Sequence, residues 1–305
     1  MVGGGPAGST LARSLTQYGM SVGVLDKEKF PRPKVCAGWV TPAVMQELQI
    51  DLEEYGRKYV LQPIRSFKTG QVGQKLVQSD YPGEPVSYGI RRTEYDNYLL
   101  RRSGAELLLN QAFKSMQREP RGWLVNETIR AGLVVGAGGH FCPVARSLGG
   151  GNSGEIAVAA QEVEFEMSPE QKANCPLDGE MPELYFTRDL KGYGWVFRKG
   201  DFLNIGLGRE DKRKLAGHVK DFCDRLQAEG RIPRELPEKF RGHAYLLYHH
   251  ATRPLVDDGV LLIGDAAGLA YPQSGEGIRP AVESALLAAQ VIVECGGDYR
   301  REQLS

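Results

Sequence analysis

The sequence lacks the paired cysteines of a disulfide framework or a zinc site. Its 305 residues include five cysteines, which stand far apart and form no CxxC pair. An odd number of scattered cysteines argues against both kinds of cross-link. We therefore expect no metal site and a reducing compartment, which favours the cytoplasm.

Long apolar runs and an excess of one charge are also missing. No run approaches the roughly 18 residues of a membrane span, and no signal-type segment opens the chain. The 38 basic and 38 acidic residues cancel, so no overall field attracts nucleic acid or an anionic membrane. We expect a cytoplasmic protein without a nucleic-acid partner, and peripheral membrane contact stays open.

Glycine, in contrast, is abundant, and one glycine cluster opens the chain. "VGGGPAGSTLA" places Gly3, Gly5 and Gly8 in a GxGxxG pattern ahead of a helical stretch, and "SVGVLD" then reads as a strand that ends at Asp26. In a dinucleotide-binding βαβ unit such glycines let the backbone approach a pyrophosphate, and the acid accepts hydrogen bonds from a ribose. Only two residues precede Gly3, where a strand should stand, so we expect a truncated or damaged first strand and weakened cofactor binding.

A second glycine cluster lies near the other end of the chain. In "LLIGDAAGLAYPQSGEGIRP" a buried strand leads to Asp265, at the strand end where open α/β sheets place ligands. The helix that follows begins among Gly275, Gly277 and Pro280, so its first N–H groups have no partner within the helix and favour negative charge in front of them. A carboxylate suited to a polyol therefore stands beside a helix end that stabilises an anion.

The two clusters together carry a family resemblance. "GDAAGLAYPQSGEGI" with "VGGGPAGSTLA" resembles the FAD-binding flavoproteins typified by aromatic hydroxylases and geranylgeranyl reductases. The resemblance implies an α/β fold in which a Rossmann-like FAD-binding domain with a parallel sheet carries an inserted antiparallel β-sheet substrate domain (α+β). It also implies that Asp265 binds the ribityl chain of FAD and that the helix N-terminus faces the flavin pyrimidine edge.

Two further stretches resemble the geranylgeranyl reductase branch on the cofactor side. "YGIRRTEYDNYLL" is similar to its R-x-x-F-D motif, which implies that Arg92 reaches the FAD phosphates and that Asp96 is structural. "FPRPKVCAGWVTP" is similar to a loop that passes near the flavin ring. The matching positions of that loop are Lys34, Cys36, Ala37 and Gly38.

A third stretch, "KGYGWVFRKGDFLNIGLG", resembles the Y-x-W-x-F-P strand of the substrate domain. Tyr193, Trp195 and Phe197 alternate along it, so they share one strand face and either line an apolar cavity or pack the sheet. Two departures stand out. Arg198 replaces the expected proline, and in "VVGAGGHFCPVARSLG" Gly138 replaces the aspartate of the second FAD motif, which leaves the reductant open.

The pattern of strands and turns predicts two domains. The FAD-binding domain is assigned to residues 1–62, 86–154 and 253–305, and the substrate domain to 63–85 and 155–252. In the latter, "AAQEVEFEM", "ELYFTRD", "GWVFRKG" and "FLNIGLG" suggest one antiparallel sheet, covered by an amphipathic helix over 211–229.

These motifs yield a set of candidate site residues. The predicted catalytic residues are Cys36, Tyr193 and Trp195, with Cys36 or Tyr193 as proton donor. The predicted cofactor-binding residues are Gly3, Gly5, Pro6, Ala7, Gly8, Asp26, Lys27, Lys34, Ala37, Gly38, Arg92, Gly136, Gly264, Asp265, Ala266, Gly268, Pro272, Gly275, Glu276, Gly277 and Ile278.

The resemblance implies an FAD-dependent oxidoreductase that reduces carbon–carbon double bonds of an apolar, prenyl-type small molecule or lipid. An external reductant, NAD(P)H, ferredoxin or another, would supply the electrons. Two alternatives remain open. One is an FAD-dependent monooxygenase that hydroxylates an aromatic or polyketide-like substrate. The other is a truncated or cofactor-poor homologue without enzymatic activity.

Overall fold

The computed structural model describes residues 1–150, 155–211, 215–237, 239–250 and 253–305. These residues fold into two compact units, each built from separated parts of the chain. Unit 1 comprises Met1–Arg32, Tyr95–Ala157 and Tyr245–Ser305, and unit 2 comprises Pro33–Glu94 and Val158–Ala244.

Unit 1 is built around a sheet that is parallel except at one edge. Its strands are β7 (Glu106–Leu109), β1 (Gly23–Asp26), β11 (Val134–Gly136), β18 (Val260–Leu262) and the antiparallel edge strand β17 (Val256–Asp257). Val2 forms parallel bridges to both Leu25 of β1 and Gly136 of β11. The two residues ahead of Gly3 therefore fill the central place of the sheet, although they are too few to count as a strand.

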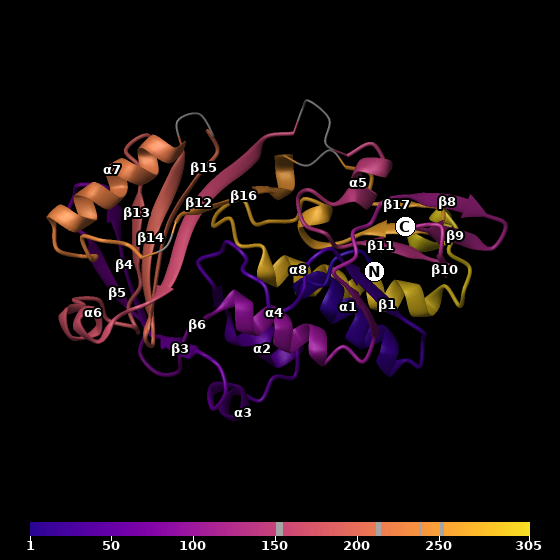
Figure 1. Cartoon of the computed structure of the whole chain (residues 1–305), viewed down its shortest axis with the longest axis horizontal. Helices are drawn as coiled ribbons and strands as arrows, with labels where there is room; N and C mark the ends of the chain where they lie inside the picture. Colours follow the sequence, from indigo (N-terminus) through magenta and orange to yellow (C-terminus); the bar gives the residue numbers. More distant parts are fainter. Residues whose placement is uncertain (151–154, 212–214, 238, 251–252) are drawn as a thin grey trace. The chain divides into compact units, whose positions relative to one another are not determined.

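Two helices pack against this sheet and against each other, namely α1 (Pro6–Gln17) and α8 (Ile278–Glu294) (Figure 1). Their shared core is rich in small residues, including Ala7 from α1 and Ala281 and Ala285 from α8. Small side chains let the helix axes come close, so the first and last parts of the chain share one core. The other elements of unit 1 are α5 (Pro143–Ser147), the meander β8 (Met116–Glu119), β9 (Gly122–Val125) and β10 (Ile129–Ala131), the 3-10 turns η1 (Tyr248–His250) and η2 (Gly264–Ala266), and α9 (Arg301–Leu304).

Unit 2 contains a seven-stranded sheet in the order β16-β12-β15-β14-β13-β4-β5. The strands are β16 (Arg241–Leu246), β12 (Ala157–Glu166), β15 (Phe202–Arg209), β14 (Gly192–Lys199), β13 (Glu183–Phe186), β4 (Ser66–Gln71) and β5 (Val77–Asp80). The described pairings are antiparallel except that of β13 with β4, which is parallel. A second sheet, β2 (Trp39–Val40), β6 (Ser87–Ile90) and β3 (Leu61–Ile64), belongs to the same unit, as do α2 (Pro42–Glu47), α3 (Leu52–Gly56) and α6 (Pro169–Asn174).

The two faces of the large sheet differ in character. Helix α7 (Leu215–Ala228) covers one face (Figure 1), where its Phe222 packs among alternate residues such as Val196 and Ile205. Because side chains alternate along a strand, the neighbouring residues Trp195 and Asn204 point to the opposite face. That second face carries the polar and aromatic side chains described below.

The predicted fold class is confirmed, since a parallel sheet with helices is joined in one chain to a mainly antiparallel sheet. Two details differ from the sequence expectations. Residues 33–62 and 86–94 pack within unit 2 and not with the parallel sheet, and one strand pair of the large sheet is parallel. The predicted helix over 211–229 is described from Leu215 to Ala228, while residues 212–214 and 151–154 lie outside the described part.

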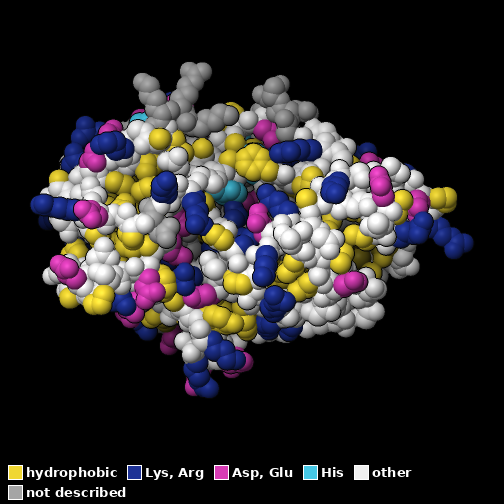
Figure 2. All heavy atoms as spheres, viewed as in Figure 1, with side chains coloured by type: hydrophobic (Ala, Val, Ile, Leu, Met, Phe, Trp, Pro, Cys, Tyr) yellow, Lys and Arg dark blue, Asp and Glu magenta, His cyan; other side chains and the backbone are white. Residues whose placement is uncertain are grey.

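The surface offers no simple charge signal. In Figure 2 acidic and basic side chains are interspersed with apolar ones over the face shown, in keeping with the zero formal net charge. Among the described residues, no helix combines the length and apolar character that a membrane crossing requires.

Candidate functional site

The parallel strands of unit 1 end at one edge of the sheet, and the predicted cofactor residues gather there. Gly3 follows the central Val2, Asp26 ends β1, and Gly264 and Asp265 follow β18. The edge at the carboxyl ends of parallel strands is where open α/β sheets bind their ligands. Segments from both ends of the sequence therefore supply groups to one ligand-binding edge.

Close backbone packing explains the glycines of the first cluster. A Cβ atom on Gly8 would collide with the carbonyl oxygen of Gly3, and Gly3, at a φ of +112°, faces Ala137 O in the same way. Gly5 is different, because an added Cβ would meet only Arg32 Nη2, at 3.6 Å. Gly3 and Gly8 thus pack the turn tightly, whereas Gly5 leaves space beside the start of α1.

Asp26 has a defined place at the end of β1. Its Oδ2 accepts the N–H of Gly4 over 2.7 Å and its Oδ1 accepts that of Glu28 over 2.9 Å. An ionised carboxylate has about four acceptor sites, so lone pairs remain for a diol. The adjacent Lys27 side chain is 74% exposed and lies 3.9 Å from Glu28, which gives it no comparable fixed orientation.

The second glycine cluster places Asp265 at the start of α8. A Cβ on Gly277, the N-cap residue of α8, would lie 2.9 Å from Asp265 Oδ1, and neither α8 nor α1 has a side-chain cap hydrogen bond among the described residues. Glu276 Oε1 is buried without a hydrogen-bond partner in the same described part, and burial raises the pKa of this carboxyl. Uncapped N–H groups and an unsatisfied buried acceptor are features of an edge built for a polar ligand.

The remaining predicted residues of unit 1 lie along the same two loops or behind them. Pro6 and Ala7 begin α1, and Ile278 begins α8. Gly136 differs, because a Cβ there would meet the side chains of Leu262, Val144 and Cys142, so its observed role is packing. Ala266 ends η2, and Gly268, Pro272 and Gly275 lie between η2 and α8.

Two arginines of unit 1 were missed by the sequence reasoning. Arg32 lies beside Gly5 and forms an ion pair with the fully buried Asp96, 3.3 Å between Nη1 and Oδ2. Arg253 makes a two-pronged ion pair with Glu155, at 2.6 and 2.8 Å, and donates to the carbonyl oxygen of Ala266 over 3.0 Å. Neither stands in a glycine motif, so only the folded structure reveals that each braces one of the two ligand-facing loops.

In unit 2 the Cys36 segment, residues 34–38, lies across the sheet face opposite α7. Lys34 Nζ is 2.6 Å from Nε2 of His243 on β16, and the Cys36 amide donates to Glu162 on β12. The other anchors are Asn204 Nδ2 of β15 on the Cys36 carbonyl at 3.2 Å and Lys199 Nζ of β14 on the Ala37 carbonyl at 3.1 Å. The segment is thus fixed to four neighbouring strands in turn.

Its last residue joins the smaller sheet. The Gly38 carbonyl accepts the N–H of Ile90 over 2.7 Å, and Gly38 has a φ of +71° with Ile90 O where a Cβ would be. The Gly38 N–H donates to Cys36 Sγ over 3.4 Å. Any other residue at position 38 would therefore disturb the backbone that carries the Cys36 thiol.

Two carboxylates beneath the Cys36 segment face one lysine. Lys199 Nζ lies 2.5 Å from Glu164 Oε1. Burial alone would raise the pKa of Glu164, but its contacts with Lys199 outweigh burial and lower it. Glu162 is 7% exposed, and burial raises its pKa to about 7, because the attraction of Lys199 is the smaller effect. Near neutral pH one carboxyl is ionised and the other is balanced between its two protonation states.

Tyr193, Trp195 and Phe197 form an aromatic stripe along one face of β14, which has a buried and an exposed part. Trp195 is buried, donates its indole N–H to Asn204 Oδ1 over 2.7 Å, and covers Gly206 so closely that a Cβ there would overlap its ring. Tyr193 is half-buried, and its ring centroid lies 6.2 Å from that of Phe186, which is 42% exposed. The aromatic surface is therefore accessible at the Tyr193 end and anchored at the Trp195 end.

The structure does not pair the two predicted proton donors. The Cys36 carbonyl contacts Asn204, which is opposite Phe197 in the strand register, and Tyr193 is four residues further along β14. At about 3.3 Å per residue this separates the two positions by roughly 13 Å. Arg92, predicted to reach FAD, is a buried residue of unit 2 at the start of α4 (Arg92–Arg101).

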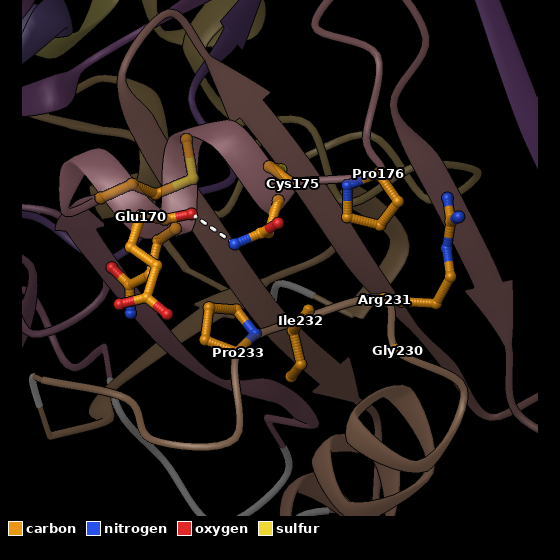
Figure 3. Close-up of a pocket in the computed structure, with 10 residues that line it drawn as sticks. Glu170, Cys175, Pro176, Gly230, Arg231, Ile232 and Pro233 are labelled. Atoms are coloured by element: carbon orange, nitrogen blue, oxygen red, sulfur yellow. Dashed lines mark hydrogen bonds between the residues drawn. The ribbon is translucent and has the colours of Figure 1, made fainter.

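A pocket of about 250 Å³ lies elsewhere in unit 2 (Figure 3). Figure 3 shows Glu170 and Cys175 on one side and Gly230, Ile232 and Pro233 on the other, from α6 and from the segment after α7. None of the predicted site residues lines it. The predicted site residues therefore lie in two places that are described separately, the ligand-facing edge of unit 1 and the aromatic face of unit 2.

This combination of fold and site defines a class of protein, the α/β oxidoreductases that bind a dinucleotide-type cofactor at the carboxyl edge of a parallel sheet. No family model matches the chain. Among known proteins, the chain is 26% identical over 327 residues to digeranylgeranylglycerophospholipid reductase 3 of Methanosphaera stadtmanae, which covers the whole chain and 79% of that protein. It is 30% identical over 323 residues to the chloroplastic geranylgeranyl diphosphate reductase of rice, which covers 96% of the chain and 65% of that protein.

Solved structures show the same fold. A geranylgeranyl bacteriochlorophyll reductase-like protein from Thermoplasma acidophilum matches with a TM-score of 0.81 at 23% identity, covering 99% of this chain and 80% of that one. The halogenase PltM in complex with FAD matches with a TM-score of 0.76 at 18% identity, covering 99% and 70%.

These findings confirm the resemblance seen in the sequence motifs: the chain is similar to geranylgeranyl reductases over nearly its whole length. The halogenase neighbour shares the fold at lower identity. The roles of the individual site residues remain predictions.

Proposed function

We propose that the chain binds FAD and uses it to reduce carbon–carbon double bonds of a prenyl-type molecule. The observation that carries the proposal is one sheet face of unit 2, which presents an accessible aromatic surface around Tyr193 and Phe186 and, four residues away along β14, the fixed Cys36 segment. Aromatic side chains offer large apolar area to a hydrocarbon chain. The names of the relatives, digeranylgeranylglycerophospholipid reductase and geranylgeranyl diphosphate reductase, support a substrate of this class.

The residues of unit 1 fit FAD. The turn at Gly5 and the uncapped start of α1 would take the pyrophosphate, and Asp26 the ribose. Asp265 would hold the ribityl chain, and the N-terminus of α8 would stabilise negative charge on the ring. In unit 2, Lys34, Ala37, Gly38 and Arg92 are the proposed additional contacts.

Bound reduced FAD supplies a hydride, and the protein must supply a proton to complete the reduction. Cys36 Sγ, which accepts the Gly38 N–H, and Tyr193 Oη, whose ring lies 6.0 Å from that of Trp195, are the proposed donors. The test is a pair of single variants, Cys36→Ser and Tyr193→Phe, and the double variant, all reduced in advance without oxygen. If the double variant turns over substrate at the parent rate, neither group is the donor.

The substrate class is tested with geranylgeranyl diphosphate and with a digeranylgeranyl glycerophospholipid. Pre-reduced protein is mixed anaerobically with each lipid, and the return of the oxidised-flavin absorbance is followed. The mass of the product is then measured by mass spectrometry. We expect a gain of two hydrogens for each bond reduced. A gain of one oxygen in air would instead establish the monooxygenase alternative.

Retention of FAD distinguishes the two enzymatic alternatives, reductase and monooxygenase, from the third alternative, a cofactor-poor homologue without activity. The desalted protein, after incubation with excess FAD, should keep a flavin absorption spectrum. A colourless protein would identify the chain as a cofactor-poor homologue, and the substrate experiments would then have no basis. The external reductant is tested separately by supplying NADPH or reduced ferredoxin to the retained flavin, since Gly138 leaves that choice open.

A further inference from the structure

The Cys36 segment is held almost entirely through its backbone. Three main-chain groups, Cys36 N–H, Cys36 C=O and Ala37 C=O, contact three side chains of the sheet. Those side chains are Glu162 of β12, Asn204 of β15 and Lys199 of β14. The position of the segment therefore depends on the state of a polar cluster below it and not on the cysteine side chain.

Glu162 and Asn204 together form the centre of this cluster. Asn204 is fully buried, and its Nδ2 lies 3.2 Å from the Cys36 carbonyl, from Glu162 Oε1 and from Glu164 Oε1. Its Oδ1 is taken by the Trp195 indole N–H. Glu162 Oε2 accepts the Cys36 amide. A single carboxyl thus connects the segment to the asparagine that also orients the aromatic stripe.

We infer that Glu162 is a positioning residue for the proposed reaction. It holds the Cys36 segment against the sheet, in what we call the seated state, by accepting the Cys36 amide N–H. Ionisation of Glu162 favours a lifted state, in which the segment has left the sheet. The inference rests on the proposed function, because the segment matters to catalysis only if the site is the one proposed. The seating itself is a property of unit 2 and can be measured without flavin or substrate.

The charged groups around Glu162 set the direction of its pH response. Lys199, the Cys36 amide N–H and Arg92 favour its negative charge, Glu164 repels it, and Lys199 is already paired with Glu164. Arg91 lies 3.5 Å from Glu164, and on the β16 side the segment is bounded by Lys34 with His243. Burial outweighs the attractions, so the seated segment favours the protonated carboxyl.

Lifting the segment would expose Glu162 to water and return its pKa toward the ordinary value for a glutamate. Linkage then requires that raising the pH favours the lifted state, in the window between that ordinary value and about 7. The opening equilibrium should change by up to on the order of a hundredfold across this window. Above a pH of about 7 the opening equilibrium should not change further from this cause.

Hydrogen exchange of the full-length protein tests the seating directly. Deuterium uptake of a peptide that isolates the Cys36 amide is measured by mass spectrometry at pH 5.5 and 7.5 and corrected for intrinsic exchange. Glu162→Gln keeps an acceptor that cannot ionise, and Glu162→Ala removes the acceptor. Glu166→Gln is the matched control, because Glu166 lies on the same strand and the same face but is exposed.

We expect protection of the Cys36 amide to fall with pH in the parent and in Glu166→Gln, and to stay constant in Glu162→Gln. In Glu162→Ala exchange should be faster than in the parent at pH 5.5 by about tenfold or more. If Glu162→Ala does not fold, the pH response of Glu162→Gln compared with that of the parent still tests the inference. Equal protection in Glu162→Ala and the parent, or the parental pH response in Glu162→Gln, would overturn the inference.

A second measurement separates this inference from the proposed function. In the flavin-loaded protein, Glu162→Gln should flatten the pH profile of anaerobic flavin reoxidation by the prenyl substrate, whereas Glu166→Gln should keep it. If the exchange results are as expected but the protein binds no flavin or reduces no prenyl chain, the proposed function is refuted. The role of Glu162 in holding the Cys36 segment would still stand. A parental pH profile in Glu162→Gln despite altered exchange would show that seating does not govern the reaction, and would overturn that part of the inference.

Discussion

The burial of Glu162 predicts that the stability of unit 2 falls as the pH rises from about 4.5 to 7. The folded protein holds a proton on Glu162 up to a pKa of about 7, whereas the unfolded chain releases it near the reference value of 4.5. Between these values the folded state binds more protons than the unfolded state, so the free energy of unfolding decreases with rising pH. The contribution is therefore fully present below pH 4.5 and lost above pH 7.

The size of the effect follows from the same two values. The difference is about 2.5 pKa units, and each unit corresponds to about 1.36 kcal/mol. The carboxyl should therefore cost unit 2 about 3 kcal/mol of stability between pH 4.5 and 7. Glu162→Gln removes the titrating group, so the parent-minus-variant difference in free energy of unfolding should fall by that amount across the window.

Urea unfolding followed by tryptophan fluorescence can isolate unit 2. Trp39 and Trp195 belong to unit 2 and Trp123 to unit 1, so both proteins are compared in a Trp123→Phe background. Glu166→Gln should show no comparable pH dependence, since Glu166 is exposed. A parent-minus-variant difference that stays within about 0.5 kcal/mol from pH 4.5 to 7.5 would refute the reasoning that burial controls this carboxyl.

Four further substitutions test other parts of the protein. Gly8→Ala would place a Cβ against a backbone oxygen of the glycine turn, so the desalted protein should lose its flavin spectrum. Gly217→Ala lies in α7 with open space around it, so it should stabilise unit 2 by about 1 kcal/mol in urea unfolding. Trp195→Phe should cost about 1–3 kcal/mol by the same assay, because a buried amide oxygen loses its donor; an unchanged unfolding midpoint would contradict this. Asp96→Ala leaves a guanidinium buried without its carboxylate and should cost about 3 kcal/mol, read from Trp123 fluorescence in unit 1; a cost under about 1 kcal/mol would show that the pair contributes little.

Local motifs made much of unit 1 predictable. The spacing from Gly3 to Asp26 fixes a turn, a helix and a strand in one supersecondary unit, and the acid after the β18 strand marks the same sheet edge from the other end of the chain. Val2 lies between β1 and β11, because it forms hydrogen bonds on the β11 side while Met1 and Gly3 form hydrogen bonds to Leu25 of β1. The expectation of a damaged first strand did not consider that neighbouring strands could hold so short a segment in place.

The polar cluster of unit 2 could not be predicted in this way. In "QEVEFE" the glutamates 162, 164 and 166 alternate as on a strand with one face in water. Only Glu166 is exposed, since Glu162 is covered by the Cys36 segment and Glu164 is paired with Lys199. The covering residues come from more than a hundred positions earlier, and no local pattern announces them. Arg32 was missed for the same reason, because its role depends on Asp96 and on a turn elsewhere in the sequence.

The way the Cys36 segment crosses the sheet has a consequence for how this part of the gene can vary. Neighbouring strands lie about 4.8 Å apart, so passing from β16 to β14 spans roughly 14 Å, about the length of four extended residues. The anchors at positions 36 and 37 are main-chain groups, which any residue other than proline provides. Substitutions at positions 36 and 37 would therefore alter the chemistry of the segment without releasing it, whereas inserting or deleting a single codon would move every later anchor onto the wrong strand.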